Sequence, residues 1–128
     1  MYVIPLVLIL ALSMVPALSE EYTDVAIIDI KITPENPKVG EHVEGKITIQ
    51  NLGNVRTKIG FSVDVEGPRG GGGMGGFGIK LRPGEVVVLP VSFDVNERGA
   101  YRVSANVFSV VYDKNLENNK AVIKIIVE

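Results

Sequence analysis

The sequence predicts an all-β fold, a two-sheet antiparallel sandwich of seven to eight strands. Three observations predict it. Apolar and polar residues alternate in run after run, which is the period of a strand with one buried face. Turn residues separate these runs at intervals of roughly 8 to 15 residues, as in sandwiches and small barrels. No segment after residue 19 has the apolar spacing of an amphipathic helix.

The first 19 residues differ from the rest of the chain. Residues 1–19 carry no charged side chain and are almost continuously apolar. As a helix, the apolar run of about 17 residues would span roughly 26 Å, slightly less than a hydrocarbon core of about 30 Å. Ala17 and Ser19 supply small residues at positions −3 and −1 of a cleavage point. We therefore expect a signal peptide at 1–19, or alternatively a retained N-terminal anchor, followed by one domain at 20–128.

Residues 43–50 show the clearest alternation. Pro34 and Pro37 precede this run, and neither can lie inside a central strand because each lacks a backbone donor. The turn residues of 51–54, Asn-Leu-Gly-Asn, end it. The apolar face of the expected strand consists of Val43, Gly45, Ile47 and Ile49.

Six further runs alternate in the same way. They span residues 24–33, 58–66, 77–81, 86–95, 100–111 and 121–127. The first is expected to bury a face made of Ala26, Ile28, Ile30 and Ile32. Pro90 indicates an edge strand or a bulge, because proline cannot donate to a ladder. Tyr101 begins the next-to-last run, where its hydroxyl can bond a nearby backbone carbonyl and stabilise the strand entry.

Composition excludes several classes of function. The 128 residues include no cysteine, so neither a disulfide framework nor a thiolate metal site can form. The formal net charge is −2, with acids and bases interspersed, and no basic stripe indicates nucleic acid binding. His42 is the single histidine, and no local motif supplies a nucleophile beside it, so a solvated surface side chain is expected. The sequence predicts a protein that is not an enzyme.

The polar segment 113–119 is the one candidate for a metal site. Asp113, Asn115 and Glu117 stand at alternate positions, as oxygen ligands do at the start of a calcium loop. The sixth position, however, is Asn118 rather than glycine. We expect a turn whose side chains bond their own backbone and no cofactor, with calcium as the alternative.

Residues 70–78 contain seven glycines, interrupted by Met74 and Phe77. A phosphate-binding loop would need a following Lys-Ser/Thr and a helix, whereas here a strand is expected to follow. This composition predicts a flexible hairpin connection. A second hypothesis is a binding tip that presents Met74 and Phe77 to a partner or a lipid interface.

The order of motifs along residues 24–128 resembles that of the CARDB family, the cell-adhesion-related domain found in bacteria, and of immunoglobulin-like domains of archaeal surface proteins. The resemblance implies an immunoglobulin-like sandwich displayed outside the cell. The glycine-rich segment departs from the pattern, and the family has no shared ligand site to transfer. The matching motifs are Asp24-Val25, residues 37–41, 51–54, 81–85 and 99–103, and Asp113 through Asn119.

Three hypotheses for function follow. The first is a non-enzymatic, secreted or cell-surface module for adhesion to a surface protein or glycan. The second is a structural spacer or assembly subunit whose edge strands pair with neighbours. The third is a carbohydrate-binding accessory domain, although the chain has no Trp and only four Tyr to stack on sugar rings. Contact with a membrane is expected only through an uncleaved N-terminal segment.

Overall fold

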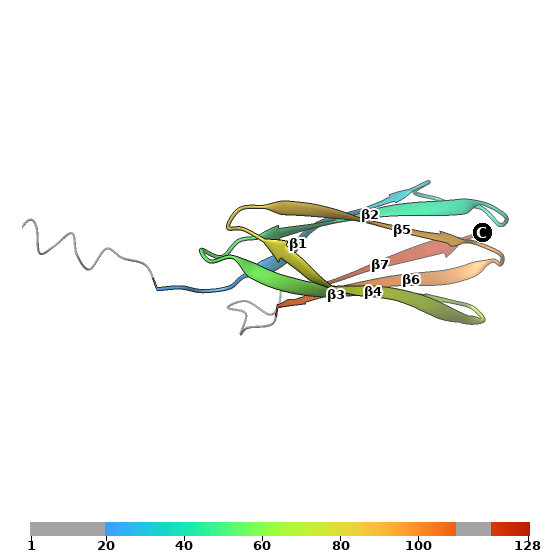
Figure 1. Ribbon diagram of the computed structural model, residues 1–128. Coiled ribbons are helices and arrows are strands. Elements are labelled where there is room, and N and C mark those ends of the chain that lie inside the picture. Colours follow the sequence, from blue (N-terminus) through green and yellow to red (C-terminus); the bar gives the residue numbers. More distant parts are fainter. Residues whose placement is uncertain (1–19, 110–118) are drawn as a thin grey trace, which may run out of the picture.

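The computed structural model describes residues 20–109 and 119–128, and these residues form two antiparallel sheets packed face to face (Figure 1). The predicted all-β sandwich is therefore confirmed. The strands are β1 (Val25–Thr33), β2 (His42–Asn51), β3 (Thr57–Gly67), β4 (Gly70–Leu81), β5 (Val86–Asp94), β6 (Gly99–Ser109) and β7 (Lys120–Val127).

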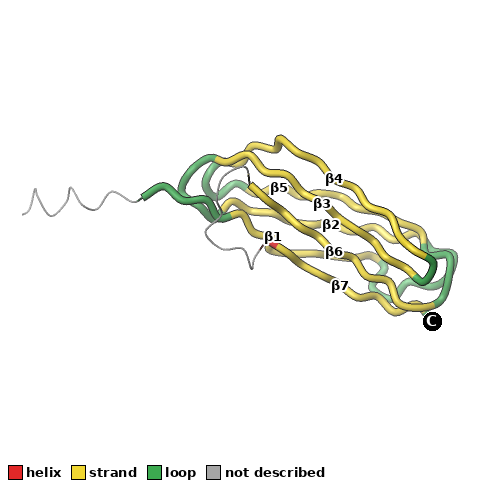
Figure 2. The backbone as a smooth tube through the Cα atoms, turned by 90° about the horizontal axis from the view of Figure 1, so that it is seen from below, coloured by secondary structure: helices red, strands yellow, loops and turns green. Residues whose placement is uncertain are grey.

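The smaller sheet has the strand order β1-β2-β5, and the larger has the order β4-β3-β6-β7 (Figure 2). Each sheet thus has two edges. β1 packs against β6 and β7 at one side of the sandwich, so the other two edge strands, β4 and β5, lie at the opposite side. β5 contains Pro90, which confirms the edge position predicted for that proline.

The alternating residues meet between the sheets as predicted. Ile47, Val63, Val91, Val103 and Ile125, one from each of five strands, are at most 5% exposed. Each contributes roughly 1.5–3 kcal/mol by removal from water. The apolar faces read from the sequence for β2, β3, β5, β6 and β7 all point into this core.

The predicted face of β1 is wrong before the bulge, at Ala26 and Ile28, and right after it, at Ile30 and Ile32. The register between β1 and β2 shifts between Ile27 and Asp29, so Ile28 has no partner across the ladder and is 47% exposed. This bulge reverses the alternation within the strand. Before the bulge Val25 and Ile27 face the core, and after it Ile30 and Ile32 do. Ala26 is buried, but it pairs with Gln50 on the opposite face of the sheet.

The glycine-rich segment is a strand, not the flexible connection that its composition predicts. It forms most of β4, and its backbone pairs with β3 from Gly67↔Gly70 to Thr57↔Leu81. The turn between the two strands is only Pro68-Arg69. The prediction from composition is wrong because it ignores the partner strand. β3 contains strong β-formers, and pairing with it offsets the entropy that the glycines lose when their backbone is ordered.

Tyr101 has the role predicted for it. Its hydroxyl donates to the carbonyl oxygen of Glu97 at 3.0 Å and accepts from the Glu97 amide at 3.2 Å. The side chain is 7% exposed and its ring stacks on Phe93 at 6.3 Å between centroids. This tyrosine corner ties the turn before β6 to the core.

Candidate binding groove between strands β4 and β5

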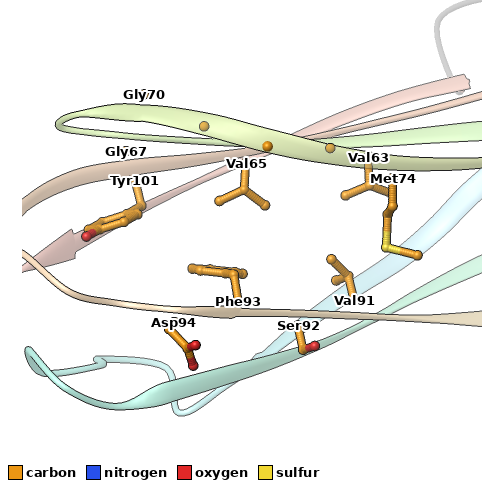
Figure 3. A pocket seen from close by; sticks show the side chains of 13 residues that line it. Val63, Val65, Gly67, Gly70, Met74, Val91, Ser92, Phe93, Asp94 and Tyr101 are labelled. Carbon is orange, nitrogen blue, oxygen red and sulfur yellow. The ribbon is translucent and has the colours of Figure 1, made fainter.

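A groove opens between the two sheets along the edge where β4 and β5 lie. Its volume is about 360 Å³. Figure 3 shows Val65 pointing from one sheet toward Phe93 on the other, and Met74 pointing toward Val91. The residues that line it are Val63, Val65, Gly67, Gly70, Gly71, Gly72, Gly73, Met74, Val91, Ser92, Phe93, Asp94 and Tyr101.

The groove is open because two inward-facing positions of β4 carry no side chain. Gly72 lies opposite Val65 in the register, and Gly70 lies opposite Gly67. Apolar side chains at these inward positions would cover the core. A Cβ placed on Gly72 would meet no atom within 4 Å, so the space beside it is empty. Val65 and Phe93 consequently remain only partly buried.

The outward-facing glycines of β4 have a different physical cause. A Cβ on Gly71 would collide with the carbonyl oxygen of Val65, and a Cβ on Gly73 would collide with the carboxylate of Asp64. Glycine is therefore required at position 71, where the contact is with backbone, whereas at position 73 the Asp64 side chain would have to move away. Gly72, in contrast, is not required for the strand to form.

Met74 and Phe77 lie on opposite faces of β4. The hypothesis that one flexible tip presents both side chains to a partner is therefore wrong. Met74 pairs with Val63, lines the groove and is 44% exposed. Phe77 pairs with Gly60 on the outer face and is 61% exposed. Its ring stacks on Phe108 at 6.3 Å, and both rings pack over Gly60. Only Met74 belongs to the groove.

Two carboxylates lie on the outer, solvent-facing side of the larger sheet, next to the edge strand β4. Asp64 and Glu66 of β3 lie opposite Gly73 and Gly71 in the register. Because those glycines have no side chains, the carboxylate of Asp64 extends over the backbone of β4. Arg102 of β6 is the neighbour of Glu66 on its other side. Among residues 20–109 and 119–128, no ion pair involves Asp64 or Glu66.

His42 is exposed, as predicted, and has a partner that the sequence did not indicate. It lies opposite Asp94 in the β2–β5 ladder, and its Nδ1 is 2.7 Å from the carboxylate. Both side chains are more than half exposed. An exposed pair of this kind contributes little to stability. Asp94 points away from the groove in Figure 3, as does Ser92.

The candidate calcium ligands Asp113, Asn115 and Glu117 lie outside the described residues, as does the predicted signal peptide at 1–19. In the described part of the chain, no three acidic or histidine side chains come together to hold a metal ion. In the same residues, no helix is long and apolar enough to cross a membrane.

Comparison with solved structures places the fold. The chain is similar to the CARDB domain of a Pyrococcus furiosus protein, crystallised in complex with di-metal ions. The two share 25% identity at a TM-score of 0.71, over 87% of this chain and 93% of that chain. The solution NMR structure of that domain gives 24% identity and a TM-score of 0.68, over 84% and 97% of the two chains.

More distant matches show the fold alone. A β-glucosidase from Listeria innocua is 16% identical at a TM-score of 0.54, and the match covers 86% of this chain but 17% of the enzyme. No protein-family profile matches the sequence. No curated protein matches it either.

The protein is an immunoglobulin-like β-sandwich. Within that class it is a CARDB-like domain, as the order of its motifs predicts.

Proposed function

We propose that this chain is a non-enzymatic, extracytoplasmic adhesion module that binds a protein partner in the groove between β4 and β5. The observation that carries the proposal is the empty space beside Gly72, where the core remains accessible from outside. Partly buried apolar side chains at an open edge have a hydration cost that a partner would remove. Met74 suits such a site because its side chain adapts to irregular surfaces.

The extracytoplasmic location rests on the predicted signal peptide and on the resemblance to CARDB. The absence of cysteine is compatible with that location, because the core of Ile47, Val103 and other buried residues stabilises the fold without disulfides. The di-metal ions belong to the Pyrococcus furiosus domain. For this chain we expect no metal requirement.

The variant Gly72→Leu tests the proposal. A leucine at this position would fill the groove without strain, because its Cβ meets no neighbouring atom and its backbone is not in the left-handed region. The full-length chain and the variant are immobilised and exposed to native envelope extract, and the retained proteins are identified by mass spectrometry. We expect a protein retained by the wild type to be lost from the variant, while the melting temperature is unchanged or higher.

Val122→Leu is the matched control, because it changes neither the net charge nor the lysines of β7. It places the same new side chain on an exposed position of β7, at the other edge of the larger sheet. This control should retain the same protein as the wild type. If Gly72→Leu retains it as well, the groove is not the binding site and the proposal fails.

A spacer or assembly subunit is the second candidate. The free edge of β4 favours it, since edge strands of neighbouring subunits can pair. Sedimentation of the purified chain separates the two. A monomer that captures a foreign protein supports the adhesion module, whereas self-association without capture supports assembly.

A further inference from the structure

We propose that the groove binds an extended polypeptide segment with alternating apolar and basic side chains, which adds as a new strand to the free edge of β4. This inference rests on the proposed binding function and specifies its partner. Three features of β4 lead to it: an unprotected backbone edge, empty positions on the inner face, and carboxylates on the outer face.

The backbone edge of β4 is unprotected compared with the other three edges. Folded proteins block edge strands with charged residues, prolines or bulges, because an open edge pairs with other chains. β5 has Pro90, β7 has Lys120 and Lys124, and β1 has a bulge. β4 carries no charge over residues 70–79 and has its one register irregularity near Gly78. An edge of this length offers a partner a row of main-chain donors and acceptors.

The inner face of β4 requires apolar side chains from the added strand. Side chains of the new strand that point inward would lie beside Gly70 and Gly72, where β4 itself supplies none. They would cover Val65 and Phe93, which remain only partly buried. Because the side chains of a strand alternate, the inward residues are every second residue of the partner.

The outer face requires basic side chains. The residues between these apolar ones would point outward, level with Gly71 and Gly73. A long lysine or arginine side chain can lie across these glycines and reach the carboxylates of Asp64 and Glu66. Asp64 is the stronger attractor, because its carboxylate already extends over Gly73 and Arg102 neighbours Glu66. Opposite charges across strands stabilise pairing, and like charges oppose it.

The inner and outer faces of β4 argue against a second copy of this chain as the occupant. A second β4 strand would bring mostly glycines to the space beside Gly72, which would remain unfilled. Over residues 70–79 it would also bring no basic side chain to Asp64 and Glu66. A basic partner strand is therefore preferred over self-pairing.

Peptides of about nine residues, the length of a typical strand, test the inference. A peptide of alternating valine and lysine is compared with one of alternating valine and glutamate, by calorimetric titration into the full-length chain. A third peptide is the lysine sequence with N-methyl groups on alternate backbone nitrogens, which removes the donors that would face β4. We expect the lysine peptide to bind at least 10-fold more tightly than either control.

Variants of the chain test the same inference independently of the peptide sequence. Asp64→Asn should weaken binding of the lysine peptide about 2-fold to 5-fold, the upper part of the range for an exposed ion pair, and should reduce the salt dependence of binding. Gly72→Leu should weaken binding of the lysine peptide at least 10-fold, and Val122→Leu should leave it unchanged. Amide hydrogen exchange should slow for alternate residues between Gly70 and Met74 when the peptide is bound.

The outcomes separate this inference from the proposed function. Equal binding of the lysine and glutamate peptides, or full binding of the N-methylated one, overturns the inference. If no peptide binds while envelope capture still depends on Gly72, the adhesion module stands and strand addition is wrong. If capture does not depend on Gly72, the proposed function itself fails. Concentration-dependent dimerisation lost in Gly72→Leu would identify a second copy as the occupant.

Discussion

Replacing Asn51 by alanine should destabilise the fold strongly, although Asn51 is only the last residue of β2. Asn51 is 0% exposed. Its Nδ2 donates to the carbonyl oxygens of Leu81 and Val55, each at 3.0 Å, and its Oδ1 accepts from the Gly53 amide at 2.9 Å. The side chain therefore joins the end of β2 to the end of β4 and closes the turn between β2 and β3.

The magnitude follows from these bonds. The bonds to Leu81 and Gly53 are buried, and the bond to Val55 is partly buried. A buried group left without its partner costs about 1–3 kcal/mol. Since alanine leaves two fully buried groups unpaired and one partly so, we expect a loss of about 3–4 kcal/mol. In a domain of this size that corresponds to a fall in melting temperature of roughly 12–20 °C.

Asn54→Ala is the matched control, because it makes the same chemical change in the turn that follows β2. The Asn54 side chain also bonds backbone, to Tyr22 and Glu20, but these bonds are exposed and water can replace them. We expect its loss to be below about 1 kcal/mol. Thermal and urea unfolding monitored by circular dichroism measure both variants. Equal losses at Asn51 and Asn54 would refute the assignment of the buried bonds as the cause.

Further predictions concern the core, the tyrosine corner, metal and processing. Ile47→Asp should prevent folding because an unpaired charge would enter the core, whereas Gln50→Asp should change the melting temperature little; equal losses would mean that the faces of β2 are reversed. Tyr101→Phe should cost about 1 kcal/mol through its two bonds to Glu97, and a cost near zero in urea unfolding would contradict that role. Millimolar calcium should not raise the melting temperature, and a rise of several degrees would assign a metal site. Intact mass from the native host should show cleavage after Ser19, and recovery of the uncleaved chain in the membrane fraction would support an anchor instead.

Much of the fold could be predicted because strand alternation is a local property. The alternation of apolar and polar residues in β2, β5 and β6 indicates which residues are buried, and reading it requires no knowledge of the partner strand. Tyr101 could be assigned for the same reason, since its carbonyl partner is only four residues away. The order of turn motifs likewise led to the CARDB-like fold.

The binding groove could not be predicted, because it depends on pairings between residues distant in sequence. The composition of residues 70–78 indicates a flexible segment, and only the ladder with β3 makes it a strand. That pairing in turn separates Met74 from Phe77 and leaves the space beside Gly72 open to Phe93. The bulge that exposes Ile28 has the same origin, since it is a register shift against β2. Local periodicity determines which side chains a strand can bury, but strand pairing and sheet order determine which strand is an edge and what that edge leaves uncovered.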